Sequence, residues 1–209
     1  MKIHSYNEWD PLRSVVVGRA DHANWPVKDP VFALEKQRTL WKHTPVPSGP
    51  VPDWIIDEAN EDLETLADRL KSLGVEVLRP DDLNFQTHDG MYNYCPRDRL
   101  LVYGDTIVNP AMMYPCRDME LQCYHDIVDS ATNYLFMPRH EGMILDAANI
   151  ARLNDHWIFL ESASGNRAAY EWLCDHFPAV DIELVNFYSG VHIDSTIVPL
   201  REGLALVNG

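Results

Sequence analysis

The residues of this sequence best suited to chemistry are one histidine and three aspartates at regular intervals. His192 and Asp194 stand two positions apart, and side chains two apart on an extended strand point to the same side. Asp98 and Asp146 precede Asp194 at equal steps of 48 residues, from 98 to 146 and from 146 to 194. Each aspartate opens an apolar run that reaches a turn and leads into a second apolar run. The pattern predicts a repeated fold that gathers carboxylates at one site.

Each of these residues also has a plainer structural interpretation. An aspartate before a strand often accepts hydrogen bonds within a turn, and a lone histidine is often a buried side chain with its hydrogen bonds satisfied. The common spacing of the acids and the proximity of His192 to Asp194 favour a functional role. A histidine titrates near neutral pH, so it can act first as an acid and then as a base.

The first of the predicted units is a strand, a long connection, a helix and a second strand. Arg13–Gly18 and Val75–Leu78 have the apolar character of strands. Asp53 is expected to cap a helix that runs to about Leu73, with Gly74 as its stop. Its apolar positions recur every three or four residues and predict one buried stripe: Ile56, Ala59, Leu63, Leu66, Leu70 and Leu73.

The connection from Ala20 to Asp53 is predicted to be irregular. It contains the proline-rich stretch Thr44–Pro52, and proline lacks a backbone donor and fixes φ. Trp25, Trp41 and Trp54 flank it. Two interpretations stay open, a long loop pinned to the body by these aromatic side chains or a lid over a site.

The second and third units repeat the order strand, strand, helix, strand, and a fourth ends after its first two strands. Repeats of about this length are typical of propellers, arrays and solenoids. Because the fourth unit has neither helix nor return strand, its apolar face and sheet edge are expected to be uncovered. The predicted strands are 99–103, 106–108, 134–137, 147–153, 157–160, 182–185, 195–200 and 204–207, and the predicted helices are 118–133 and 166–177.

Composition places the chain in an ordinary globular class. Its 209 residues are enough for one domain with a sizeable core, which we expect to span residues 1–209. A net charge of −15 disfavours nucleic acid and anionic membranes as partners and suits a cationic small molecule such as a guanidinium or an amine. No run approaches the roughly 18 apolar residues of a membrane span. The four cysteines show no secreted or metal-binding spacing, so a cytoplasmic location is expected.

The chain resembles the amidinotransferase family, which includes glycine and inosamine-phosphate amidinotransferases, within the pentein superfamily of five-unit α/β propellers. The similarity runs in order from Asn7 to Asn208, nearly the whole chain, and the order and spacing of its pieces make it specific. The stretches that carry it are Asn7–Arg19, Pro96–Val102, Asp146–Ile150, Ser162–Asn166 with Trp172–Leu173, and His192–Thr196. The resemblance implies an α/β pentein fold of which about three units and a fourth hairpin are present.

The resemblance further implies transfer of the amidino group from arginine, or another guanidino donor, to an amine acceptor through a covalent amidino-cysteine. Asp146 and His192 correspond to the catalytic aspartate and histidine, and Asp98 and Asp194 to carboxylates that bind the guanidinium. This agrees with their chemistry, because paired carboxylates hold a planar guanidinium by charge-assisted hydrogen bonds. The implied reaction needs neither a metal nor an organic cofactor.

The sequence departs from the family at the nucleophile, a cysteine that the family carries near its C-terminus. Cys95, Cys116, Cys123 and Cys174 do not match that context and are predicted to be structural, although Cys95 lies three residues from Asp98. The chain is therefore expected to be incomplete, inactive alone, and prone to self-association or to pairing with a complementing chain. Two alternatives remain, a non-catalytic remnant that binds arginine-like ligands or a partner, and a guanidine-modifying hydrolase of the same superfamily.

Overall fold

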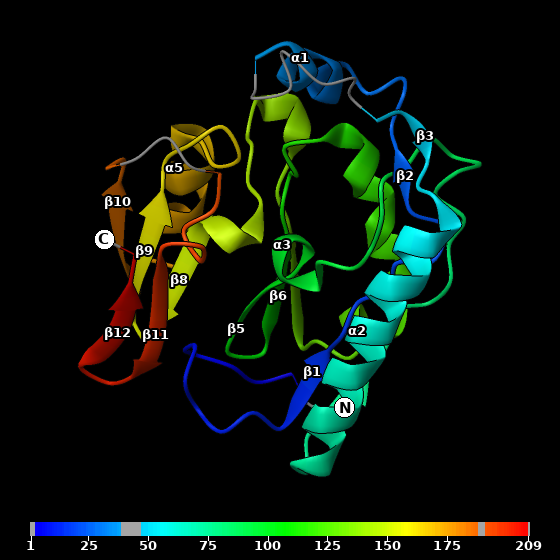
Figure 1. The fold of residues 1–209 in the computed structure, drawn as a ribbon. Helices are drawn as coiled ribbons and strands as arrows, with labels where there is room; N and C mark the ends of the chain where they lie inside the picture. The colour runs from blue at the N-terminus through cyan, green and yellow to red at the C-terminus, as the bar shows by residue number, and fades with distance from the viewer. Residues whose placement is uncertain (1–2, 39–46, 188–190, 209) are drawn as a thin grey trace. The chain divides into compact units, whose positions relative to one another are not determined.

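A computed structural model describes residues 3–38, 47–187 and 191–208 and shows a mixed α/β protein (Figure 1). The chain divides into two compact units. Unit 1 consists of Met1–Pro11, Arg97–Met113 and Asp126–Gly209, and unit 2 consists of Leu12–Pro96 and Tyr114–His125. That the whole of 1–209 forms one domain stays a prediction.

Unit 1 contains two three-stranded sheets of the same topology, so the strand order of the predicted repeat is confirmed in its second and third copies. In each sheet the first two strands pair antiparallel and the third pairs parallel with the second. A parallel neighbour requires a crossover connection, and α5 (Arg167–His176) lies in that connection in the third copy (Figure 1). The sheets are β5 (Leu101–Tyr103), β6 (Thr106–Asn109) and β7 (Asn133–Phe136), and β8 (Ile150–Leu153), β9 (His156–Leu160) and β10 (Asp181–Val185).

The hairpins of unit 1 turn where the sequence predicts. Gly104, Asn154 and Gly203 have φ of 58°, 65° and 73°. This left-handed backbone suits glycine and asparagine and matches the twist of a two-strand hairpin. The third of these turns joins β11 (Ile197–Arg201) to β12 (Leu204–Val207), which form the predicted fourth hairpin.

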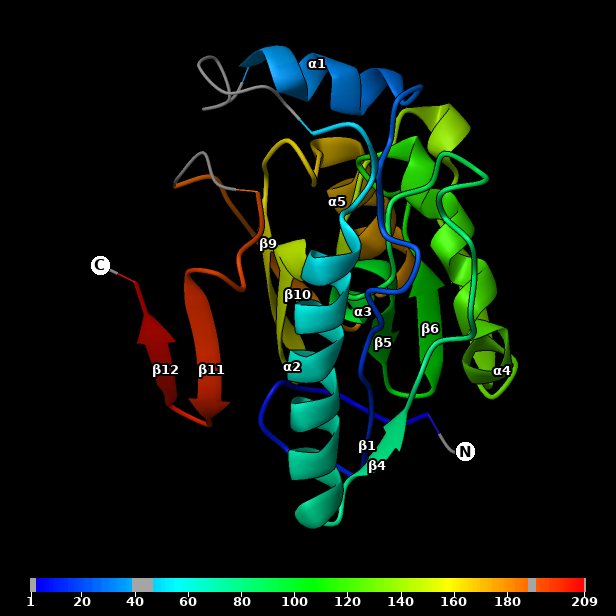
Figure 2. The ribbon, with the colours of Figure 1, turned by 45° about the vertical axis from the view of Figure 1, so that its right-hand side comes forward.

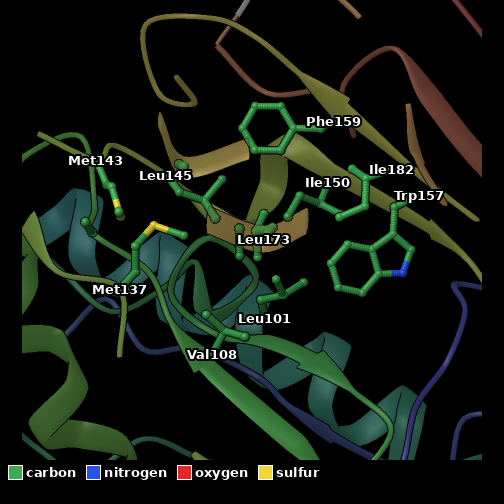
Figure 3. Close-up of a cluster of buried hydrophobic side chains, with 13 residues drawn as sticks. Leu101, Val108, Met137, Met143, Leu145, Ile150, Trp157, Phe159, Leu173 and Ile182 are labelled. Atoms are coloured by element: carbon green, nitrogen blue, oxygen red, sulfur yellow. The ribbon is translucent and has the colours of Figure 1, made fainter. Parts of the chain in front are cut away.

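The core of unit 1 lies between its two sheets and α5 (Figure 3). Leu173 of α5 occupies the middle of the cluster in Figure 3, beside Leu101, Val108 and Ile150 from the strands. The helix begins where the side chain of Asn166 accepts a hydrogen bond from the Ala169 N–H at 3.0 Å. Complete burial of these side chains is the main favourable contribution to the stability of this unit.

The segment before β7 differs from the predicted helix over 118–133. It contains a 3₁₀ helix, η2 (Pro115–Tyr124), followed by the single turn α4 (His125–Val128). The Ser130 and Ala131 N–H groups then donate to the Ile127 and Val128 carbonyls and close the turn. Asn133, predicted as the last helical residue, is the first residue of β7 because it pairs with Thr106. Sheet pairing here overrides local helical preference.

Unit 2 contains the predicted first repeat, in which β1 (Ser14–Val16) and β4 (Glu76–Leu78) pair in parallel. Helix α2 (Asp53–Ser72) runs alongside these strands (Figure 2). Pro52 takes the N-cap position, so the prediction that Asp53 caps the helix is wrong; Asp53 is instead an acid in the first turn. The predicted buried stripe is wrong at Leu66 and Leu73, which are 49% and 66% exposed, and the buried residue of the helix is Ala67.

The connection between β1 and α2 is more regular than predicted. It contains α1 (Pro30–Arg38), whose start is capped by the Asp29 carboxylate through hydrogen bonds from the Val31 and Phe32 N–H groups, each 2.9 Å. The strands β2 (Asn24–Trp25) and β3 (Gly49–Pro50) pair across it. Residues 39–46, which include Trp41 and the start of the proline-rich stretch, lie outside the described residues. Among the helices that are described, none is long and apolar enough to cross a membrane.

The difference between buried and exposed leucines supplies a test of the fold. Leu173→Ala is expected to lower the free energy of unfolding by about 2–5 kcal/mol, because it leaves a cavity in the core of unit 1. The matched change Leu66→Ala on the exposed face of α2 is expected to change it by no more than about 0.5 kcal/mol. Urea unfolding followed by circular dichroism measures both. Equal losses would contradict this assignment of the core.

Candidate functional site

The segment Val191–Thr196 is a turn and not the extended strand that the sequence predicts. The N–H groups of Thr196 and Ile197 both donate to the Ile193 carbonyl, at 2.8 and 2.9 Å. Ile193 is fully buried against Ala151 and Leu160. The alternation of side chains along a strand, which was expected to point His192 and Asp194 to the same side, therefore does not apply here. The two residues lie on either side of the buried Ile193 in the sequence.

A hydrogen-bond network holds this turn from its N-terminal side. The Val191 carbonyl accepts hydrogen bonds from the Ser162 hydroxyl at 2.8 Å and the Ser164 hydroxyl at 2.6 Å. The Ser164 oxygen in turn accepts from the Asn149 side-chain amide at 2.9 Å. The Ile193 N–H donates to the Ala148 carbonyl at 3.2 Å. His192 is thus fixed through the backbone on both sides, a role of Ser162 and Ser164 that their sequence alone did not reveal.

The structure places His192 against Asp146. The His192 Nε2 atom lies 3.1 Å from Asp146 Oδ2. The other carboxylate oxygen of Asp146 accepts a hydrogen bond from the Met113 N–H at 2.8 Å. Asp146 is only 2% exposed. Its carboxylate is held from both oxygens and can fix the orientation of the imidazole ring.

Asp98 approaches the other nitrogen of the same ring. It lies on α3 (Pro96–Arg99), a single helical turn before β5, where the sequence had predicted the start of a strand. The His192 Nδ1 atom is 3.7 Å from Asp98 Oδ1, and Asp98 is 7% exposed. Buried carboxylates therefore face both ring nitrogens.

Asp194 is the most accessible of the three acids, with a side chain 37% exposed. Its Oδ2 atom lies 3.8 Å from Nε of Arg97, and an Arg97 terminal nitrogen lies 3.4 Å from Oε1 of Glu8. Sequence reasoning assigned no role to Arg97 or Glu8, although both fall inside stretches that carry the family resemblance. All four predicted site residues belong to unit 1.

The charges of the site act on one another. Burial tends to lower the pKa of His192, but the hydrogen bond to Asp146 and the negative charges of Asp98, Asp146 and Asp194 outweigh it, so the pKa lies above its ordinary value. The pKa of Asp194 is also raised, chiefly by burial and further by Asp98 and Glu8, against the opposing charges of Arg97 and His192. The three acids can attract a cation, and the protonated ring beside them can supply a proton.

Three of the four cysteines belong to unit 2 and one to unit 1. Cys95, Cys116 and Cys123 belong to unit 2, and burial raises the pKa of the Cys116 and Cys123 thiols. Cys174 lies on α5 and packs against the core of unit 1. Within the described residues, no group of His, Cys, Asp and Glu side chains has the arrangement of a metal site.

Comparisons with known proteins agree with the sequence resemblance. No protein-family model matches the chain. It is 34% identical to inosamine-phosphate amidinotransferase 1 of Streptomyces glaucescens, over 97% of this chain and 68% of that protein. The solved structure of an inosamine-phosphate amidinotransferase from Streptomyces griseus superposes with a TM-score of 0.87 at 33% identity, over 98% of this chain and 69% of that one. A dimethylarginine dimethylaminohydrolase shares the fold at 14% identity, with a TM-score of 0.66 over 95% of this chain and 70% of that one.

The contact between His192 and Asp146 can be tested through the pKa of His192. We expect the His192 imidazole to titrate above the ordinary histidine pKa and the substitution Asp146→Asn to lower that pKa, because the variant loses the negative charge next to Nε2. Since the folded protein binds this proton more tightly than the unfolded chain, the contact stabilises the fold below the ordinary histidine pKa. That stabilisation is lost as the pH rises through the folded pKa.

NMR of the imidazole carbons across a pH series makes the measurement. Asp175→Asn, which removes one exposed carboxylate from α5, is the charge-matched control and should leave the His192 titration in place. An Asp146→Asn variant that titrates like the parent protein would show that the contact has no electrostatic effect.

Proposed function

This chain belongs to the amidinotransferase family, and on that premise we propose that its site binds arginine or a related guanidino donor and takes part in transferring the amidino group to an amine acceptor. The observation that carries the proposal is the arrangement of three carboxylates around His192. It combines the two requirements of the reaction, a cluster of negative charge for a guanidinium and a group that moves protons near neutral pH.

Donor binding is assigned to Asp98 and Asp194. A guanidinium presents five N–H donors in a plane and pairs with carboxylates by charge-assisted hydrogen bonds. Asp194 is the accessible member of the pair and Asp98 the buried one. The net charge of −15 of the whole chain also favours approach of a cation.

Proton transfer is assigned to His192, with Asp146 as its orienting partner. When a thiolate attacks the guanidino carbon, the leaving amine needs a proton, which protonated His192 can give. The neutral ring can then take a proton from the acceptor amine as its nitrogen attacks the amidino carbon and the thiolate departs. The raised pKa of His192 suits the first step, since it keeps the ring protonated near neutral pH.

None of the four cysteines of residues 1–209 is proposed as the nucleophile. A thiolate is the reactive form, and burial disfavours it at Cys116 and Cys123. Cys174 packs against the core through α5, and Cys95 does not match the family's nucleophile. We therefore expect these 209 residues alone to bind the donor without turning it over.

The same intermediate could be released by water, as in the hydrolase alternative. Water attack on an amidino-cysteine would yield urea, whereas an amine acceptor yields a new guanidino compound. The relatives of 33–34% identity carry amidinotransferase names, while the hydrolase likeness of 14% identity supports the fold alone. We propose the transferase for this reason.

The repeated sheets also support a proposal about architecture. Two complete units, the parallel pair of the first and the hairpin of the fourth follow the order of a pentein propeller. The outermost hairpin exposes apolar side chains that a completed assembly would cover, among them Leu204, Leu206 and Val207 at 45%, 60% and 65%. We propose that further polypeptide, either a second copy or a complementing chain, packs on this hairpin.

Isothermal titration with L-arginine tests donor binding. Asp98→Asn and Asp194→Asn are each expected to weaken binding at least about tenfold, since each removes a charge-assisted hydrogen bond worth roughly 1.5–3 kcal/mol. The control Asp175→Asn should bind like the parent chain. Equal affinity in all four proteins would contradict the site assignment. Release of ornithine by the 209-residue chain alone would show that one of its own cysteines is the nucleophile.

Analytical ultracentrifugation tests the exposed hairpin. The chain is expected to sediment above its monomer mass, and Leu206→Lys should shift it toward the monomer because a charge cannot be buried in the contact. Leu66→Lys places the same charge on the exposed face of α2 and should leave the association unchanged. A parent chain that stays monomeric over a wide concentration range would rule out self-association through this hairpin.

A further inference from the structure

A chain of alternating charges in unit 1 leads from the buried strand β8 to the accessible acid of the site. It consists of Arg152, Glu8, Arg97 and Asp194. Arg152 contacts Glu8 with Nε and a terminal nitrogen at 3.0 and 3.2 Å. Arg97 lies between Glu8 at 3.4 Å and Asp194 at 3.8 Å. Each group in this chain lies next to a group of opposite charge.

Arg97 is fixed in place by backbone contacts. One terminal nitrogen donates to the Ile150 carbonyl at 2.7 Å, and the other lies 3.5 Å from the Ala147 carbonyl. Ala147 directly follows Asp146 in the chain. Arg97 therefore connects the one-turn helix that carries Asp98 to the segment that carries Asp146. Its Nε atom faces Asp194.

Glu8 is the second support of this arginine. Its carboxylate also accepts a hydrogen bond from the Arg152 backbone N–H at 3.2 Å. The Arg152 guanidinium in turn donates to the Ser5 hydroxyl at 3.1 Å and to the Val102 carbonyl. Burial alone would raise the pKa of Glu8, but the charges of Arg97 and Arg152 hold it below its ordinary value. Glu8 is thus a stable anion against which Arg97 rests.

We propose that Arg97, supported by Glu8, is the positioning residue that holds a permanent positive charge beside Asp194 and orients this carboxylate for the donor guanidinium. The inference rests on the proposed function. The separation of 3.8 Å between Arg97 Nε and Asp194 Oδ2 makes this contact an ion pair and not a hydrogen bond, so Arg97 itself does not occupy a lone pair of Asp194. A closer arginine would occupy the place of the donor.

The permanence of the arginine charge gives Arg97 a role that His192 cannot fill. The groups that face Asp194 are Arg97 and His192, which favour its anion, and Asp98 and Glu8, which disfavour it together with burial. His192 loses its positive charge whenever it gives up its proton. Arginine stays protonated at every pH at which the protein is folded. Arg97 is therefore the cation that still favours the Asp194 anion when the ring is neutral.

The test compares L-arginine binding to the 209-residue chain and its variants by titration calorimetry over a pH series. In Arg97→Met, affinity near neutral pH should fall at least about tenfold, and the loss of binding in acid should begin at a higher pH, because Asp194 has lost a neighbour that favours its anion. Arg97→Lys keeps the charge and should restore the parental pH dependence with an intermediate affinity. Arg167→Met, which breaks the exposed pair with Glu161 on α5, is the matched control and should bind like the parent.

A purely structural role for Arg97 predicts a different pattern. Both Arg97 variants would then lose thermal stability while the folded protein bound L-arginine with the parental affinity and pH profile, and that result would overturn the proposal. If Arg97→Met does not fold, the lysine variant decides. Reduced affinity for L-arginine with the parental loss of binding in acid supports a positioning role, and an unchanged affinity contradicts it.

A ligand-free measurement separates this inference from the proposed function. Carbon NMR of the Asp194 carboxyl should show a higher pKa in Arg97→Met than in the parent and a parental one in Arg167→Met. If Arg97→Met does not fold, Arg97→Lys takes its place in this measurement. A parental carboxyl titration in the lysine variant then supports the proposal, and a higher pKa overturns it. If the parent chain binds no L-arginine, the proposed function fails, and this titration alone then supports or overturns the role of Arg97.

Discussion

The structure of the site depends on the cost of burying carboxylates. Asp98 and Asp146 are almost fully buried, and an ionised carboxylate in such a place is strongly destabilising unless charge and hydrogen bonds offset the loss of water. His192 faces both, and the Met113 N–H satisfies the second oxygen of Asp146. The imidazole thus helps to offset the cost of burying the two carboxylates, and they in turn orient its ring. The same contacts raise its pKa, so a larger fraction of the rings carries a proton near neutral pH.

The scaffold meets this requirement by repetition. Each aspartate precedes the hairpin of its unit, and the hairpins of the second and third units have the same antiparallel register and turn geometry. Equivalent positions of repeated units can converge on one site because each unit carries its first residue to the same edge of its sheet. The buried side chain of Ile193 and the two serine hydroxyls on the Val191 carbonyl then hold the histidine at that edge.

Arginine residues next to the site add positive charge beside its acids. A pocket made of three acids would tend to protonate one of them, since like charges raise one another's pKa. Arg97 opposes that tendency at Asp194, and Glu8, which also contacts Arg152, holds Arg97 in place.

The sequence by itself determined the repeat, its turns and the identity of the charged groups. Those features depend on local periodicity, on glycine and asparagine at left-handed positions, and on the spacing of Asp98, Asp146 and Asp194. Tertiary structure decided what depends on distant partners. It placed Asn133 in a strand and not a helix, made a turn of the segment that holds Asp194, and buried Ala67 in place of Leu66. It also brought Glu8 to Arg97 and Arg152 across 89 and 144 residues of chain, a contact that no local pattern encodes because it follows from packing.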